Sequence, residues 1–402
     1  YAIRHARDAI GWLDAIPDPR ARAEMELGFN QIMMPCLMST RGWRDEELKG
    51  VIDRSQELSD QLDDSRFLGP TLWALHQYFH ADGRHRERTR SLGERMLAHA
   101  RETADLGQEL VAEMALGHDR WIDGAYADAE RHFDRALAIY DPVQHRGLAL
   151  IYGQDPKVSV MPSYAEALWF MGQPDRSLAM AEEGLAWGRE LNHANSLAVA
   201  YIFFILLRHD RGEREAIDEL WKPLLALSER HGLPVQVAYA GVVHGWSVGD
   251  VEAAKRYLAL LESTGTELGL SFYRSVVAEA EAERGDLAAA LARIEDCRRR
   301  AEEVGETYYL AELLRLQSRF ALATGAGVEA QAEAWLRRAI DVAAGQGTKM
   351  SELRAATELA RLVARRGDAA GARALIEPRL AAITEGLDTA PLVEARELLA
   401  TL

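Results

Sequence analysis

Glycines recur along this 402-residue chain at a nearly constant interval, and this periodicity limits the available folds more than any other feature. Successive members lie 36 to 48 residues apart, and each sits between two stretches with helical periodicity. A glycine there lets the backbone leave one helix and enter the next. The nine positions are Gly42, Gly83, Gly124, Gly172, Gly212, Gly249, Gly285, Gly325 and Gly367. We therefore expect an all-α fold, a right-handed superhelix of about nine tetratricopeptide-like hairpins.

One repeat, from about Leu110 to Pro142, matches the tetratricopeptide signature closely. Its signature positions are Leu116-Gly117, Gly124, Tyr126, Ala129, Phe133 and Ala136. Gly117 and Ala129 are small enough to let two helices touch, and Phe133 fills the space beneath them. The match predicts two closely packed antiparallel helices in this part of the chain.

A single array is expected to span residues 1–402, with degenerate repeats in 1–109, clearer repeats in 110–390 and a capping helix over 391–402. A period near forty predicts helices of about 15 to 19 residues. The longest interval contains Asp-Pro steps at 141–142 and 155–156. Because a residue before proline is biased away from the helical region, we expect an irregular connection between them.

Composition disfavours several classes of protein. The excess of carboxylates over Lys and Arg gives a net charge of −16, which argues against nucleic-acid or membrane-surface binding by the whole chain. Only Cys36 and Cys297 are present, so no disulfide framework is expected, as suits a reducing cytoplasm. The longest nearly uncharged apolar stretch, 196–207, is too short to span a bilayer. We expect a cytoplasmic protein.

Motifs for catalysis are missing. The sequence has no Gly-x-x-x-x-Gly-Lys-Ser/Thr phosphate loop and no recognisable Ser-His-Asp or Cys-His nucleophile motif. His76 and His80 have the i, i+4 spacing that can hold zinc on a helix, but the sequence reveals no third ligand nearby. We therefore expect no catalytic residue, no cofactor and no metal in this chain.

An aromatic register offers candidate binding residues. Trp121, Trp169 and Trp246 each lie three residues before a repeat glycine, and His80 and His209 occupy equivalent positions. This register lies near the end of the first helix of each hairpin, whose outer side lines the concave groove of a tetratricopeptide array. It predicts a stripe that binds a protein or peptide, and packing between repeats is the alternative.

Asp155 is a further candidate, because loop positions often carry binding residues. It lies in the segment 152–156, with His145 nearby in the sequence. The pair could hold a ligand or a neighbouring domain. A segment that joins two halves of the superhelix would explain the same residues.

Several stretches carry a resemblance to a known family. They include Tyr-Asp-Pro at 140–142, Gln-His-Arg at 144–146, Tyr-Gly-Gln-Asp-Pro at 152–156, Ala-Leu-Trp at 167–169, and the segments 311–316, 352–362, 384–389 and 394–395. In these the chain resembles the C-terminal tetratricopeptide-repeat region of bacterial proteins that join a class III adenylate/guanylate cyclase domain to a STAND-type ATPase module.

This resemblance implies a non-catalytic sensor or scaffold that regulates an upstream ATPase or cyclase domain of the same polypeptide. The sequence starts at Tyr1 without an initiator methionine, and its first segment reads as the second helix of a hairpin, so we expect a fragment of a longer protein. Two alternatives remain open. They are the inducer-sensing domain of a bacterial transcription activator and a free-standing peptide-binding adaptor.

Overall fold

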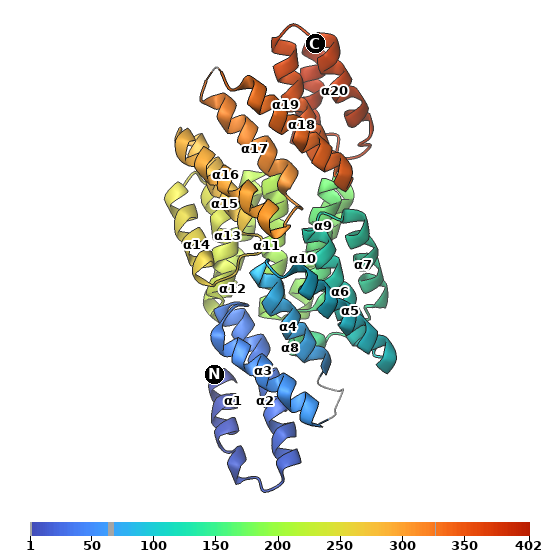
Figure 1. Ribbon diagram of the computed structural model, residues 1–402, viewed down its shortest axis with the longest axis vertical. Helices are drawn as coiled ribbons and strands as arrows, with labels where there is room; N and C mark the ends of the chain where they lie inside the picture. Colours follow the sequence, from blue (N-terminus) through green and yellow to red (C-terminus); the bar gives the residue numbers. More distant parts are fainter. Residues whose placement is uncertain (1, 63–67, 326) are drawn as a thin grey trace.

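The computed structural model describes residues 2–62, 68–325 and 327–402, and the regular structure of these residues is entirely helical (Figure 1). The helices are α1 (Ala2–Gly11), the short 3-10 helix η1 (Leu13–Ala15), α2 (Pro19–Arg41), α3 (Glu46–Leu62), α4 (Leu68–Asp82), α5 (Arg86–Thr103), α6 (Leu106–Ile122), α7 (Tyr126–Ile139), α8 (Leu148–Tyr152), α9 (Pro156–Phe170), α10 (Pro174–Leu191), α11 (Ala194–Asp210), α12 (Arg214–His231), α13 (Pro234–Ser247), α14 (Val251–Ser263), α15 (Leu270–Glu283), α16 (Leu287–Val304), α17 (Leu310–Ala323), α18 (Glu329–Gln346), α19 (Lys349–Arg365), α20 (Ala369–Ala381) and α21 (Ala390–Thr401).

The repeat glycines separate the two helices of successive hairpins, from α2–α3 to α19–α20. All nine have a positive φ, between 70° and 127°, which is the conformation that glycine adopts without steric cost. The predicted all-α hairpin array is therefore confirmed. Helices α1 to α3 lie at one end of the molecule and α18 to α20 at the other (Figure 1).

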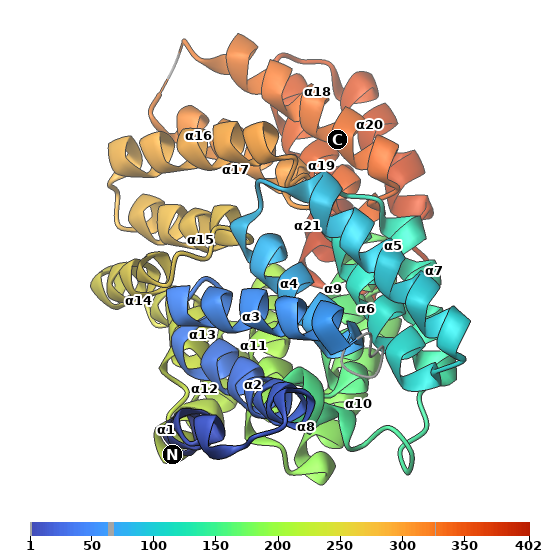
Figure 2. The same ribbon diagram turned by 60° about the horizontal axis from the view of Figure 1, so that its bottom comes forward.

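Backbone hydrogen bonds also join parts of the array that are about five hairpins apart. The carbonyl of Ala81, at the end of α4, accepts from Glu267 N at 2.8 Å, just before α15. The carbonyl of Ile122, at the end of α6, accepts from Thr307 N at 3.0 Å, just before α17. Figure 2 shows α4 beside α15. Successive turns of the superhelix thus touch, whereas in an open solenoid each repeat contacts only its neighbours.

The connection between the third and fourth hairpins differs in detail from the expected irregular segment. Asp155 is extended, as its place before Pro156 predicts, and the extended residue Tyr140 ends α7, but the connection contains the short helix α8. At the C-terminus, α21 forms where a capping helix was predicted. Of the helices formed by the described residues, none is long and apolar enough to cross a membrane.

Packing of the third hairpin agrees with the tetratricopeptide match. Ala129 and Phe133 on α7 are fully buried. A Cβ atom on Gly117 of α6 would lie 2.5 Å from Phe133 Cε1, a distance that atoms in contact do not tolerate. The two helices can therefore approach this closely only because small residues stand at Gly117 and Ala129.

Replacing Ala129 with leucine is expected to lower the free energy of unfolding by about 1–3 kcal/mol, because the added carbons must enter this closed contact. Thermal and urea melts measure the loss. Arg131→Ala, on the exposed side of the same helix, is the matched control and should stay within about 0.5 kcal/mol of wild type. Equal stability of Ala129→Leu and wild type would contradict the packing.

Candidate ligand-binding groove

Two cavities lie along the inner faces of the hairpins' first helices, at opposite ends of α11, α13 and α15. On α11, for example, Asn195, Val199 and Leu206 line one cavity, whereas His209 and Asp210 line the other. Positions spaced by three, four and seven residues share one face of a helix. The two cavities therefore lie along the same face of α11, toward its opposite ends.

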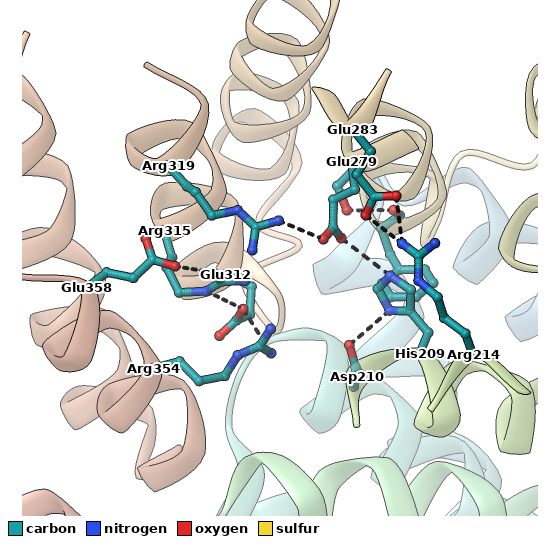
Figure 3. A network of polar contacts seen from close by, with 12 residues as sticks. His209, Asp210, Arg214, Glu279, Glu283, Glu312, Arg315, Arg319, Arg354 and Glu358 are labelled. Atoms are coloured by element: carbon teal, nitrogen blue, oxygen red, sulfur yellow. Dashed lines mark hydrogen bonds and ion pairs between the residues drawn. The ribbon is translucent and has the colours of Figure 1, made fainter. Parts of the chain in front are cut away.

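The larger cavity, which we call the charged cavity, has a volume of about 430 Å³. It lies between the C-terminal ends of α11, α13 and α15 and the helices α17 and α19. Its walls carry both signs of charge (Figure 3), including His209, Glu279, Glu283, Arg315, Arg319, Arg354 and Glu358. Such a cavity can complement a ligand that itself carries charged groups.

His209 links α11 to α15 at the rim of this cavity. Its Nδ1 lies 3.3 Å from Asp210 Oδ1, and its Nε2 lies 3.3 Å from Glu279 Oε1 on α15 (Figure 3). Burial alone would lower the pKa of His209, but the two carboxylates raise it to about 9. His209 also lowers the pKa of Glu279 to about 2 against the effect of burial. At neutral pH this is an imidazolium–carboxylate pair.

A second buried ion-pair cluster joins α17 to α19. Glu312 Oε2 accepts from Arg315 Nε at 2.8 Å and lies 3.1 Å from Arg354 NH1. Arg315 also pairs with Glu358 (Figure 3). Burial would raise the pKa of Glu312, but the charges of the two arginines lower it. The cluster fixes the relative positions of the two inner helices at the cavity wall.

The smaller cavity, which we call the amide cavity, has a volume of about 200 Å³. Its wall combines apolar and aromatic side chains with the carboxamides of Gln77, Gln154, Asn195 and Gln236. Gln236 Nε2 donates to Asn195 Oδ1 at 2.7 Å, and Asn195 Nδ2 donates to the carbonyl of Gly153 at 2.9 Å. Carboxamides offer both donors and acceptors, so this wall can hold a polar, uncharged ligand group.

The segment before α17 lies between the two cavities. Tyr308 lines the amide cavity, and its ring centroid is 5.0 Å from that of Trp121. The next residue, Tyr309, donates its hydroxyl hydrogen to Asp210 Oδ1, in the charged cavity, at 3.3 Å. Burial raises the pKa of Tyr309 well above its usual range, so this phenol stays protonated. The tyrosine pair thus stands between the two cavities.

The structure does not bring the three predicted tryptophans into one cavity. Trp121 lines the amide cavity and Trp246 the charged cavity, and each is 6% exposed. Trp169 is fully buried and lines neither; the Arg211 guanidinium lies 5.3 Å from its ring centroid. Trp169 therefore has the surroundings expected of a residue that packs between repeats.

The other predicted binding residues also lie in different places. His80 lines the amide cavity and His209 the charged cavity. Burial lowers the pKa of His80, although Asp119 opposes this effect. Asp155 is fully buried and caps α9, where it accepts from Val158 N at 3.0 Å and from the Tyr140 hydroxyl at 2.7 Å.

These contacts give Asp155 a structural role in the connection between hairpins. A role in ligand binding is a prediction for this residue, as it is for the tryptophans and histidines. His145, its expected neighbour, accepts instead from the backbone N–H of Asp141 at 2.9 Å.

Sequence reasoning missed the carboxamides, although the repeat period offered a signal. Gln154, Asn195 and Gln236 are spaced by 41 residues each, close to the repeat period, and lie just before α9 and in the first turns of α11 and α13. It also missed Asp119, which lies beside His76 and His80. Since Asp119 comes from the next hairpin, only the pairing of α4 with α6 reveals it.

Comparisons with known proteins place the chain by its fold. No protein-family model matches the chain. An uncharacterized protein of Rhizobium meliloti (strain 1021) is 25% identical over 247 residues, which is 58% of this chain and 24% of that protein. This chain therefore spans about a quarter of the length of that relative.

Solved structures that are similar to the chain include a Rap protein and a STAND protein. A Rap protein, solved in complex with competence and sporulation factor, is similar over 94% of this chain and 99% of that one, with a TM-score of 0.55 and 11% identity. A STAND protein with a tetratricopeptide repeat sensor, from Pyrococcus horikoshii, matches 94% of this chain and 55% of that one, with a TM-score of 0.44 and 11% identity. At such identity the Rap likeness shows a shared helical-repeat fold.

Proposed function

We propose that this chain is a non-catalytic tetratricopeptide-repeat sensor that binds a peptide in its concave groove and regulates an ATPase or nucleotide cyclase module in the same polypeptide. The observation that carries the proposal is the amide cavity, which carboxamides from consecutive repeats line together with aromatic side chains. The link to an ATPase or cyclase module rests on the family resemblance described above.

The chemistry of the amide cavity fits a peptide backbone. Each peptide unit presents one N–H donor and one C=O acceptor, and a carboxamide side chain can satisfy both. Gln154, Asn195 and Gln236 come from consecutive repeats, so they can follow an extended chain along the groove. Trp121 and Tyr308 supply apolar surface for a ligand side chain.

The charged cavity fits a charged part of the same ligand. His209 and Trp246 lie on its wall, and the indole N–H of Trp246 has no acceptor among the described residues. A buried donor without a partner costs free energy unless a ligand or water satisfies it. We assign a binding role to Trp121, Trp246, His80 and His209, which border the cavities.

The contacts between superhelical turns suggest how binding could be transmitted. A ligand in the groove touches helices from both the early and the late repeats, since α4, α11 and α15 all line the amide cavity. It would favour the arrangement in which the turns are in contact. By linkage, the module attached to the array would then be biased toward one of its states.

Binding of a peptide is testable with a random-sequence library displayed on phage and selected on the immobilised chain. For a synthetic copy of an enriched peptide, Gln236→Ala is expected to weaken the affinity by roughly fivefold, about 1 kcal/mol for one lost hydrogen bond. Gln144→Ala, at an exposed carboxamide, is the control and should bind like wild type. Titration calorimetry measures both variants.

Two results would contradict the proposal. One is a library that yields no peptide saturating the wild-type chain. The other is an enriched peptide that binds wild type and Gln236→Ala equally. The regulatory part is tested on the complete natural polypeptide, by measuring nucleotide turnover with and without the enriched peptide; unchanged turnover would overturn that part alone.

A further inference from the structure

Two histidines and an aspartate meet on the inner faces of α4 and α6. His76 Nε2 lies 3.0 Å from Asp119 Oδ2, and His80 Nδ1 lies 2.8 Å from Asp119 Oδ1. The imidazole rings stack at a centroid distance of 5.4 Å with an angle of 19° between their planes. His76 and Asp119 are buried, whereas His80 reaches the wall of the amide cavity. Of these three residues, the peptide proposal uses only His80, at the cavity wall.

We propose that His76, His80 and Asp119 bind a divalent transition-metal ion of the zinc type. One ligand atom from each residue lies within 4.8 Å of the other two. Zinc binds imidazole nitrogen and carboxylate oxygen at about 2.0–2.2 Å, so small side-chain movements would bring all three atoms into reach of one ion. Three protein ligands leave one coordination position open.

The pairing of α4 with α6 supplies the third ligand, which the sequence alone does not reveal. On α4 the i, i+4 spacing places both imidazoles on one face, and α6 presents Asp119 to them from the next hairpin. The sequence-based expectation that no metal binds rested on the lack of a third ligand. Asp119, 39 residues from His80 in sequence, corrects that premise.

Groups behind the cluster are compatible with a metal. Gln77 Nε2 lies 3.3 Å from His76 Nδ1. Because carboxamide oxygen and nitrogen can exchange places by a flip, Gln77 could accept from an Nδ1–H group while His76 Nε2 binds the ion. Metal-bound histidines usually donate their second N–H to such an acceptor.

Arg86 is the principal opposing charge, because its NH1 lies 4.0 Å from Asp119 Oδ1. Its guanidinium donates to Asp123 Oδ1 through Nε at 3.0 Å and through NH2 at 2.7 Å. This second carboxylate offsets the positive charge of the arginine. The cluster therefore keeps a carboxylate for the metal.

A bound ion would tie the second hairpin to the third. It would also stand at the edge of the amide cavity, because His80 borders that cavity. The open coordination position could take water or an oxygen atom of a ligand held there. The site requires no peptide, so it can exist whether or not the groove binds one.

Zinc titration of the EDTA-treated chain, followed by calorimetry, tests the site. We expect one equivalent to bind, and His80→Ala and Asp119→Asn to weaken the affinity by at least about tenfold, the lower limit seen when even a partner behind a metal ligand is removed. His244→Ala is the matched control. His244 also faces a carboxylate, Asp218, at 3.3 Å, but that carboxylate is shared with Lys222 and not with a second histidine.

Cobalt(II) added to the wild-type chain gives a second measurement that needs no variant. Visible absorption bands of low-symmetry nitrogen and oxygen coordination are expected, and zinc should abolish them. The proposal is overturned if the wild-type chain binds no zinc and shows no such bands, or if His80→Ala and Asp119→Asn bind zinc as tightly as wild type. It is equally overturned if His244→Ala loses as much affinity as they do.

Discussion

Trp169→Ala is expected to lower the free energy of unfolding by about 3–5 kcal/mol, the usual cost of emptying the space of a buried tryptophan. Trp169 is completely shielded from solvent and lies on α9, with the Arg211 guanidinium over its ring. Neighbouring side chains in such a close-packed interior can collapse only partly into the space left by the indole. Guanidinium unfolding followed by circular dichroism measures the loss.

Trp12→Ala provides the control for this experiment. Trp12 is 75% exposed, so removing the same side chain there should change stability by no more than about 0.5 kcal/mol. Trp169→Ala with the stability of wild type would show that the fourth hairpin packs differently. Trp121→Ala and Trp246→Ala are distinguished from it by their expected loss of peptide affinity, because these two residues border the cavities.

Local sequence was sufficient to predict the hairpins. The third hairpin is defined by contacts within some twenty residues. Gly124 has a positive φ at the turn, Gly117 and Ala129 are small at the helix contact, and the buried Phe133 packs against Gly117. The same glycine recurs along the chain, so the order and number of the hairpins also follow from the sequence.

The contacts between superhelical turns could not be predicted in this way. They join Ala81 to Glu267 and Ile122 to Thr307, residues that share no local pattern. Their meeting depends on the small rotation added by each hairpin, which accumulates over several repeats. Minor differences in side-chain packing determine that rotation, and the repeat signature does not record them.

For the candidate binding residues, too, the sequence could not predict contacts between separate hairpins. The common register of Trp121, Trp169 and Trp246 correctly indicates equivalent repeat positions, but it cannot tell how deep each lies once the turns close. Trp121 and Trp246 meet cavities, whereas Trp169 is enclosed. Asp119 likewise joins the two histidines only through the pairing of separate hairpins.

Glu312→Ala is expected to lower the free energy of unfolding by about 3–5 kcal/mol, because it removes a buried carboxylate that Arg315 and Arg354 share and leaves Arg315 to pair with Glu358 alone. Arg315 is only 4% exposed and pairs with Glu312 on the same helix, α17. Glu312 also pairs with Arg354 on α19 (Figure 3). Denaturant unfolding at neutral pH measures the loss. Glu303→Ala removes the same side chain from an exposed pair with Arg299 and should cost at most about 1 kcal/mol.

The pH dependence and a double-mutant cycle separate the ion pairs from simple packing. Because the pKa of Glu312 is lowered in the folded chain, its contribution is present above the ordinary carboxyl pKa and is lost as the pH falls through the folded-state pKa. The deficit of Glu312→Ala should therefore shrink in acid. Combined with Arg315→Ala, it should also cost less than the sum of the single changes. A deficit that is independent of pH, together with strictly additive losses, would show that Glu312 stabilises the array through packing and not through charge.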